Sequence, residues 1–308
     1  MRIVVVGAGA IGSLFGALLQ AAGNDVTLVG RPEHVAAIAR DGLKIEGRTE
    51  GMFRIRAVSE LPPGLEADLC LLTVKAYDLG AAAKVFGQTM KSPLPVAALE
   101  NGLGIEETTE QALLSAGWAD AKSWIVRGIN YMPATFVAPG VIRRSGDGEL
   151  LLADLGSGRH AGPIAEAFSA AGVSARVTQD REREVWRKVL VNAAIGPVTA
   201  DHGVPNGRLL LDPYRGQALR LLDEAISVAQ TEGVRFTDTD AQRELWHVVR
   251  ATAENRSSML QDMDRGRRTE IDSISGAILA IGQHRGLSLP ATELIVQRIR
   301  AKEPRRTG

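Results

Sequence analysis

Residues 1–12 read M-R-I-V-V-V-G-A-G-A-I-G, and this stretch decides the fold. The β-branched run I-V-V-V predicts a parallel strand that is buried on both faces of a sheet. Gly7, Gly9 and Gly12 follow at G-x-G-x-x-G spacing, and residues 13–22, which are rich in Leu and Ala, predict a helix. Strand, glycine turn and helix in this order are typical of a dinucleotide-binding unit, so we expect a nucleotide at this turn.

Each of the three glycines has a physical reason to be a glycine. Gly7 allows the tight turn off the strand, and Gly9 lets a pyrophosphate approach the backbone because it has no Cβ. Gly12 lets the helix pack close to the sheet. The helix then presents its first N–H groups and the positive end of its dipole to the phosphates.

The bulk composition excludes several classes of function. Lys plus Arg and Asp plus Glu both number 36 in 308 residues, so no overall basic charge favours nucleic acid as a partner. No run reaches the ~18 apolar residues of a membrane span, so we expect no membrane association. The five histidines are scattered, so we expect no metal site. The single cysteine, Cys70, permits no disulfide within the chain, which favours a reducing, cytoplasmic compartment.

The rest of the chain divides into two parts with different periodicity. Up to residue 178 we expect one sheet, with strands at 25–29, 68–74, 94–99, 124–131, 140–145, 149–155 and 173–177, a pair of strands within 43–58, and helices at 32–41 and 161–171. Beyond residue 180 we expect helices ending near 197 and at 214–232, 240–256, 269–282 and 292–302. The sequence therefore predicts an α/β fold, with a Rossmann-like dinucleotide-binding domain over residues 1–178 and an all-α domain over residues 179–308.

The residues after the second expected strand indicate which dinucleotide binds. NAD-selective folds place an acidic residue there to hold the ribose 2′-hydroxyl, whereas this chain has Gly30 and Arg31. A guanidinium can grip a 2′-phosphate in bidentate fashion, so Arg31 favours NADP(H) over NAD(H). The alternative for a single arginine is a solvated loop charge.

Two further polar residues follow strands that we expect in the same sheet. Lys75 follows the strand at 68–74 and Asn101 follows the strand at 94–99, which places both at the edge where open α/β sheets bind ligands. The amide of Asn101 could bind a ribose, a nicotinamide or a substrate oxygen. The alternative is ordinary Asn-Gly turn chemistry.

The helical part offers one candidate pair. Lys188 and Asn192 lie four residues apart, so they share one face of a helix. A lone helical lysine is usually a solvated charge, but asparagine inside a helix is mildly unfavourable unless it bonds something. We therefore take the two together as candidate site residues.

Seven motifs along the chain carry a family resemblance: G-A-G-A-I-G, T-V-K-A-Y-D, E-N-G-L-G, W-R-K-V-L-V-N, P-N-G, E-N-R-S-S-M-L-Q-D and R-R-T-E-I-D. In this order and spacing the chain resembles the ketopantoate reductases (2-dehydropantoate 2-reductases) over nearly its whole length. The resemblance implies an oxidoreductase that reduces 2-dehydropantoate to (R)-pantoate with NADPH, on the route to pantothenate.

The resemblance also implies a role for particular residues. The resemblance implies that Lys188 is the catalytic proton donor. It also implies that Lys188, Asn192, Asn206 and Ser258 bind the substrate. It assigns a longer set to the cofactor: Gly7, Ala8, Gly9, Ala10, Ile11, Gly12, Arg31, Lys75, Asn101, Ala134 and Glu270. Glu224 matches an acidic residue near the family's site, without a firm role.

One departure bears on the substrate. The family usually continues its lysine helix as I-N-P-L-T-A, whereas this chain has Gly196 in place of the asparagine, two turns beyond Lys188. Three explanations are open. Water replaces the missing amide, the pocket accepts a different and bulkier 2-oxo acid, or the change is tolerated drift.

Other classes of function stay open as alternatives. The first is an NADPH-dependent reductase of a different 2-oxo acid in the same family. The second is a regulatory protein that binds NADPH without turnover, against which Lys188, Asn192, Ser258 and Glu270 argue. The third, an opine-type or 3-hydroxyacid dehydrogenase, needs a catalytic histidine that the sequence does not offer convincingly. A homodimer through the helical domain is compatible with the sequence but does not follow from it.

Overall fold

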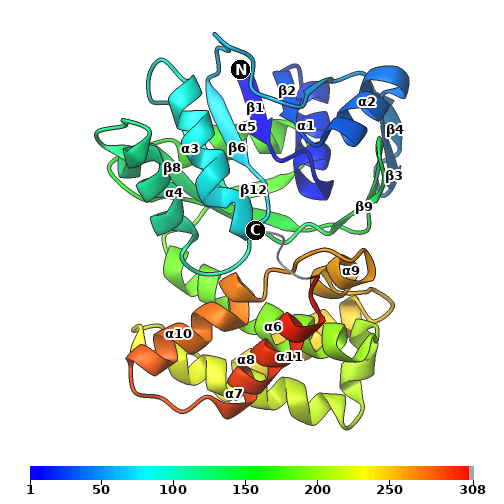
Figure 1. Ribbon diagram of the computed structural model, residues 1–308, viewed down its shortest axis with the longest axis vertical. Helices are drawn as coiled ribbons and strands as arrows, with labels where there is room; N and C mark the ends of the chain where they lie inside the picture. Colours follow the sequence, from blue (N-terminus) through cyan, green and yellow to red (C-terminus); the bar gives the residue numbers. More distant parts are fainter. Residues whose placement is uncertain (305–308) are drawn as a thin grey trace. The chain divides into compact units, whose positions relative to one another are not determined.

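The computed structural model describes residues 1–304 and separates into two compact units (Figure 1). The first unit comprises residues 1–100 and 105–181, and the second comprises residues 101–104 and the chain from 182 onward. The loop 101–104 thus belongs to the second unit, although the residues on both sides of it belong to the first. No local pattern in the sequence indicates this grouping.

An eight-stranded sheet forms the centre of the first unit, in the order β12-β11-β8-β7-β6-β1-β2-β5. Neighbouring strands are parallel except β8 and β11. The strands are β1 (Arg2–Val6), β2 (Asp25–Val29), β5 (Arg56–Val58), β6 (Leu69–Leu72), β7 (Val96–Ala98), β8 (Ile125–Asn130), β11 (Glu149–Asp154) and β12 (Ser174–Val177). The expected α/β fold with a mainly parallel sheet is confirmed.

Helices cover both faces of this sheet, as Figure 1 shows. They are α1 (Ala10–Ala21), α2 (Pro32–Asp41), α3 (Leu79–Thr89), α4 (Ile105–Ser115) and α5 (Ala161–Ala170), with short 3₁₀ turns η1 (Ala76–Asp78) and η2 (Ala121–Trp124). Side chains alternate along a strand, so Ile3 and Val5 enter the core under α1 and α5. Val4 and Val6 enter the core under α3 and α4. The uninterrupted apolar run of β1 is therefore explained by burial on two sides.

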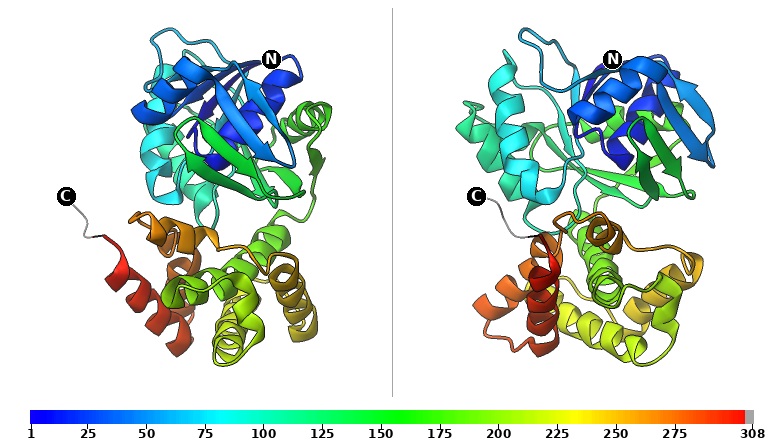
Figure 2. Two further views of the ribbon diagram at one scale, coloured as in Figure 1. Left: turned by 90° about the vertical axis from the view of Figure 1, so that its right-hand side faces the viewer. Right: turned by 45° about the vertical axis from the view of Figure 1, so that its right-hand side comes forward.

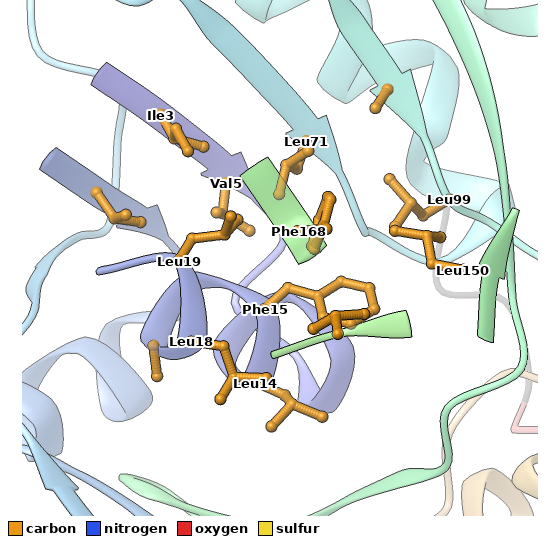
Figure 3. Close-up of a cluster of buried hydrophobic side chains, with 14 of the residues drawn as sticks. Ile3, Val5, Leu14, Phe15, Leu18, Leu19, Leu71, Leu99, Leu150 and Phe168 are labelled. Atoms are coloured by element: carbon orange, nitrogen blue, oxygen red, sulfur yellow. The ribbon is translucent and has the colours of Figure 1, made fainter. Parts of the chain in front are cut away.

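The core on the α1 face is drawn in Figure 3, where Ile3, Val5 and Leu71 of the sheet face Phe15 and Leu19 of α1. The rings of Phe15 and of Phe168 in α5 meet in a T-shaped arrangement, with 4.9 Å between the ring centroids. These contacts fix the helix that follows the glycine turn against the sheet.

A second, four-stranded sheet corrects two expectations. Its order is β4 (Gly51–Phe53), β3 (Leu43–Gly47), β10 (Val141–Arg144) and β9 (Ala134–Ala138). The segment 43–58 contributes three strands rather than a pair, and the third, β5, joins the main sheet. The segment at 140–145 does not complete the main sheet, because its charged V-I-R-R sequence suits a strand with one solvent face. Figure 2 shows these distant segments side by side.

The second unit is helical throughout its described regular elements, which confirms the expected all-α region. These elements are α6 (Arg181–His202), η3 (Asn206–Leu210), α7 (Tyr214–Thr231), α8 (Asp238–Ala251), α9 (Ser258–Asp264), the π-helical turn η4 (Asp272–Gly276), α10 (Ala277–His284) and α11 (Pro290–Lys302). Within residues 1–304, none of the helices has the length and apolar character needed to cross a membrane.

The expected end of the lysine helix near Pro197 is wrong. Helix α6 continues through Pro197 to His202, although a proline inside a helix costs about 3 kcal/mol. Residues 193–201 are all buried, and their burial offsets this cost. Thr199 supports the same turn, because its hydroxyl donates to the carbonyl of Ile195 at 2.9 Å.

The expected helix at 269–282 begins later than the pattern indicates and runs on to His284. Thr269 does not enter a helix; its hydroxyl donates to the Glu303 carboxylate at 2.6 Å and accepts the N–H of Ile271 at 3.2 Å. Regular helical structure begins only with η4. This capping arrangement holds Glu270 in a turn rather than on a helix face.

Candidate active site

The glycine turn is locked against the end of β6. Gly7 has φ +109°, and a Cβ built on it would lie 2.5 Å from the backbone nitrogen of Val74, so only glycine fits. A Cβ on Gly12 would collide with the carbonyl oxygen of Gly7. Thr73 donates from its hydroxyl to that same carbonyl at 2.8 Å. By contrast, a Cβ on Gly9 would meet nothing nearer than 4.0 Å, so the outer side of the turn is open.

The start of α1 fits an anionic pyrophosphate. Gly9 occupies the N-cap position and no side chain caps the helix, so the first N–H groups, from Ala10 to Gly12, are left for a ligand. The N–H of Ala8 is different, because it donates to the carbonyl of Val29 at 2.8 Å. If Ala8 contacts a cofactor, it does so through other atoms.

Arg31 and Lys75 lie on the two sides of this turn. In the sheet, β1 has β2 on one side and β6 on the other. Arg31 follows β2 and is exposed, directly before α2 with Pro32 in its first turn. Lys75 follows β6, is half-buried and precedes η1. Both cations are thus placed at the carboxyl edge of the strands that flank β1.

Ala134 lies in a different part of the first unit. It is the first residue of β9 in the second sheet, it pairs with Arg144, and its side chain packs against the apolar core. A methyl group offers no polar contact, so any polar contact of Ala134 with a cofactor is through its backbone.

Within the second unit, Asn101 and Glu270 come together. Asn101 Nδ2 donates to Glu270 Oε2 at 3.3 Å, and Glu270 is 6% exposed. The loop 101–104 is held beside this pair because the N–H of Leu103 donates to the carbonyl of Ser273 at 2.9 Å. Gly102 has φ +107°, and a Cβ there would collide with the same carbonyl. The sequence places both polar residues in the cofactor set but gives no sign of their contact.

Lys188 and Asn192 lie on α6, one turn apart. Both are half-buried, next to buried Val189 and Trp186, so the pair sits at the border between the apolar core and a polar surface. A lysine in such a setting can present its ammonium to a ligand while its methylenes pack against apolar neighbours.

Asn206, at the start of η3, has one satisfied and one unsatisfied side-chain atom. Its Nδ2 donates to Thr252 Oγ1 at 2.9 Å, and its backbone N–H donates to the carbonyl of Asn255 at 2.9 Å. Asn206 is 6% exposed, yet its Oδ1 finds no donor within residues 1–304. A buried acceptor without a partner is costly, so Oδ1 is suited to a ligand that brings a donor.

Ser258 is exposed and begins α9, but its neighbour Ser257 caps that helix. Ser257 Oγ accepts the N–H of Leu260 at 3.1 Å and lies 2.7 Å from Thr199 Oγ1. The Ser258 hydroxyl is therefore not the one that caps the helix. The contact between Thr199 and Ser257 was not anticipated from the sequence, and neither was that between Asn206 and Thr252, because both join separate helices.

Met259 occupies the space beside Gly196. A Cβ built on Gly196 would lie 3.6 Å from both the Cβ and the Cε of Met259, which is ordinary van der Waals contact. Both residues are buried. The position two turns beyond Lys188 thus has an apolar neighbour.

Glu224 has a structural partner. Its two carboxylate oxygens accept the N–H groups of Ala291 at 2.9 Å and Thr292 at 2.7 Å, at the start of α11. This is the position where a carboxylate satisfies unpaired helix donors and the helix dipole. Residues 1–304 contain no cluster of His, Cys, Asp and Glu side chains that could hold a metal ion.

Comparison with known families gives a match over both units. The family described as ketopantoate reductase PanE/ApbA matches residues 3–157, and its C-terminal part matches residues 180–303. The 2-dehydropantoate 2-reductases of Archaeoglobus fulgidus and Pyrococcus horikoshii are 34% and 35% identical to this chain, with 98% of each chain covered.

Solved structures give the same result. A PanE/ApbA family ketopantoate reductase from Ralstonia eutropha is 29% identical, with a TM-score of 0.87 and 98% of both chains covered. A ternary complex of D-mandelate dehydrogenase with NADH and anilino(oxo)acetate is 27% identical, with a TM-score of 0.89 and the same coverage. The resemblance drawn from the motifs is confirmed, and this chain belongs to the ketopantoate reductase PanE/ApbA family of NAD(P)-dependent oxidoreductases.

Proposed function

We propose that this enzyme reduces 2-dehydropantoate to (R)-pantoate with NADPH, as a step of pantothenate biosynthesis, with Lys188 as the proton donor. The observation that carries the proposal is the pair Lys188 and Asn192 on one face of α6, in a chain whose first residues form a dinucleotide turn. The names of the full-length relatives at 34–35% identity support this substrate.

In this proposal the reactive ketone lies beside Lys188. NADPH, held at the glycine turn of residues 7–12, would supply the hydride for the ketone carbon. Negative charge then develops on the carbonyl oxygen, and the ammonium of Lys188 stabilises that charge and donates the proton. The amide of Asn192 orients the substrate. Ser258, with its neighbouring backbone amides, binds the carboxylate.

Asn206 favours a substrate that carries a hydroxyl group. Its buried Oδ1 needs a donor, and 2-dehydropantoate has a hydroxyl at the end remote from its carboxylate. A hydrogen bond from that hydroxyl would satisfy the oxygen, and a substrate without one would leave it unpaired at a cost of about 1–3 kcal/mol.

The preference for NADPH rests on Arg31. This exposed guanidinium stands where NAD-selective folds have a carboxylate, and it suits a 2′-phosphate. In the proposed arrangement Lys75 supports the same adenosine phosphate, and Asn101 and Glu270 serve the ribose and nicotinamide side.

We further propose that residues 1–178 form the NADP-binding domain and residues 179–308 the substrate domain, through which a homodimer would form. A cytoplasmic location agrees with the single, buried Cys70, which can make no disulfide within the chain.

A second candidate is a reductase of a 2-oxo acid with an apolar side chain. The apolar contact of Met259 at Gly196 favours it, and so does the similarity to a D-mandelate dehydrogenase. The unpaired Asn206 oxygen argues for the first candidate, because an apolar side chain brings no donor.

A panel of 2-oxo acids, assayed with NADPH and with NADH through the nicotinamide absorbance band, tests both candidates. We expect the highest kcat/KM for 2-dehydropantoate with NADPH. A higher kcat/KM for phenylglyoxylate, or for a branched 2-oxo acid without a hydroxyl group, would establish the second candidate. Tight NADPH binding without turnover of any member would reject both in favour of a regulatory protein.

A further inference from the structure

Arg127 is a charged side chain in the interior of the main sheet. It lies in the middle of β8 and is 3% exposed. Burying a guanidinium is costly unless charges and hydrogen bonds compensate it, so such a residue needs a reason. The carboxylate of Glu106 supplies charge, with 3.3 Å between Arg127 Nε and Glu106 Oε1.

The guanidinium binds the backbone where β7 ends. Its Nη1 lies within hydrogen-bond distance of three carbonyl oxygens, those of Glu100 at 2.8 Å, Gly128 at 3.1 Å and Ala98 at 3.2 Å. The ladder between β7 and β8 stops at the pair Ala98 and Arg127. Of the three carbonyls only that of Glu100 lies beyond this pair, and there the side chain of Arg127 is a donor in place of a neighbouring strand.

The carbonyl of Glu100 belongs to the peptide bond that leads into Asn101. That peptide is thus held on the side of the sheet by Arg127. The loop 101–104 that follows is held within the second unit, by the carbonyl of Ser273 and by Glu270. Glu100 is itself buried, at 4% exposed.

We propose that Arg127 is a positioning residue for the cofactor: by fixing the Glu100 carbonyl, it sets the direction of the Asn101 amide on the nicotinamide side. This inference rests on the proposed function, in which Asn101 serves that side of NADPH. Arg127 acts through the backbone and through Asn101, and touches neither the cofactor nor the substrate.

A double-mutant cycle tests the proposal through binding rather than turnover. We expect Arg127→Met to raise the Kd of NADPH roughly 5- to 10-fold, while Arg127→Lys, which keeps a charge and donors, raises it less. In the Asn101→Ala background, Arg127→Met should change the Kd by less than about 2-fold, because the group it positions is gone.

A fragment of NADPH and a control substitution distinguish a loss of positioning from a general loss of structure. Adenosine 2′,5′-bisphosphate carries only the adenosine end, so its Kd should stay within about 2-fold in every variant. Arg2 is an exposed arginine at the amino end of β1. Arg2→Met should leave the Kd values of NADPH and of the fragment unchanged. Circular dichroism confirms that each variant is folded.

The proposal would be overturned if Arg127→Met raised the Kd of NADPH by the same factor in the wild type and in the Asn101→Ala background. It would also be overturned if Arg127→Met raised the Kd of the fragment as much as that of NADPH. If Arg127→Met fails to fold, the Arg127→Lys cycle gives the same decision. Wild-type protein that binds neither NADPH nor the fragment would instead reject the proposed function.

Discussion

The side-chain amide of Asn101 donates to the carboxylate of Glu270 across 3.3 Å, although 169 residues separate them in the chain. The contact exists because the loop 101–104 leaves the first unit and packs with the second. A buried carboxylate such as Glu270 needs donors, and the Asn101 amide is one of them.

We expect Asn101→Ala and Glu270→Ala each to weaken NADPH binding by roughly 5-fold or more, since each removes one partner of a part-buried pair. The double variant should lose less than the product of the two effects, because the second change removes an interaction that is already broken. Fluorescence titration of the four proteins measures this coupling. Effects that multiply fully would mean that the two residues act independently.

Arg31→Ala should separate the two cofactors. Loss of a bidentate contact to the 2′-phosphate should raise KM for NADPH by roughly 10-fold or more and leave KM for NADH unchanged. Steady-state assays with both cofactors measure this. A variant that still prefers NADPH as strongly as the wild type would show that Arg31 is only a solvated loop charge.

Much of the first unit could be predicted because its signals are local. The I-V-V-V run and the glycine spacing specify β1, the turn and α1 within 21 residues. The second sheet could not be predicted in the same way, because β3 pairs with β10, about a hundred residues away, and nothing near β3 indicates that partner. The sequence predicts too early an end for helix α6, because the energetic cost of a proline inside a helix is evident from Pro197 itself. The burial that offsets this cost depends on tertiary packing, which the local sequence does not show.

Lys188→Ala should lower kcat by roughly 10² or more while the Kd of NADPH stays within about 2-fold, because in the proposed function the ammonium acts in the chemical step. Stopped-flow and steady-state assays measure the two quantities. Lys84→Ala, which removes an exposed lysine from α3, is the matched control and should leave both unchanged. Near wild-type turnover of Lys188→Ala would remove this residue from the mechanism.

The sequence predicts a set of candidate site residues but not the contacts that these residues make. Family motifs point to Asn206 and Ser258, but the unpaired Oδ1 of Asn206 and the capping role of Ser257 depend on how η3, α8 and α9 pack. Glu224 shows the same limit: the family resemblance suggests a place near the site, whereas its contacts are at the start of α11.

Glu224→Ala should therefore lower stability rather than turnover. Two backbone donors of α11 lose their acceptor, and we expect a cost of about 1–2 kcal/mol in the free energy of unfolding. Glu224→Gln, which keeps one acceptor oxygen, should cost less. Chemical denaturation measures stability, and kcat per folded molecule should stay near the wild-type value. A loss of kcat in a fully folded Glu224→Gln protein would instead give the residue a part in the reaction.

His34 links three parts of the first unit and makes its stability depend on pH. Its side chain is 2% exposed, its Nδ1 accepts the N–H of Gly140 at 2.9 Å, and its Nε2 lies 3.0 Å from the hydroxyl of Ser13. Because Nδ1 is an acceptor, the neutral ring carries its proton on Nε2 and donates to Ser13. Burial lowers the pKa of His34 below its ordinary value.

A basic group whose pKa is lowered by folding binds its proton more readily in the unfolded chain. The stabilisation is therefore fully present above the ordinary histidine pKa of about 6.5 and is lost as the pH falls below it. We expect the free energy of unfolding to drop by about 1 kcal/mol between pH 7.5 and 5.5, measured by urea denaturation. His34→Gln is neutral at both pH values and should lose this dependence, whereas His284→Gln, which changes an exposed histidine, should keep it. The same drop in His34→Gln as in the wild type would assign the pH dependence to another group.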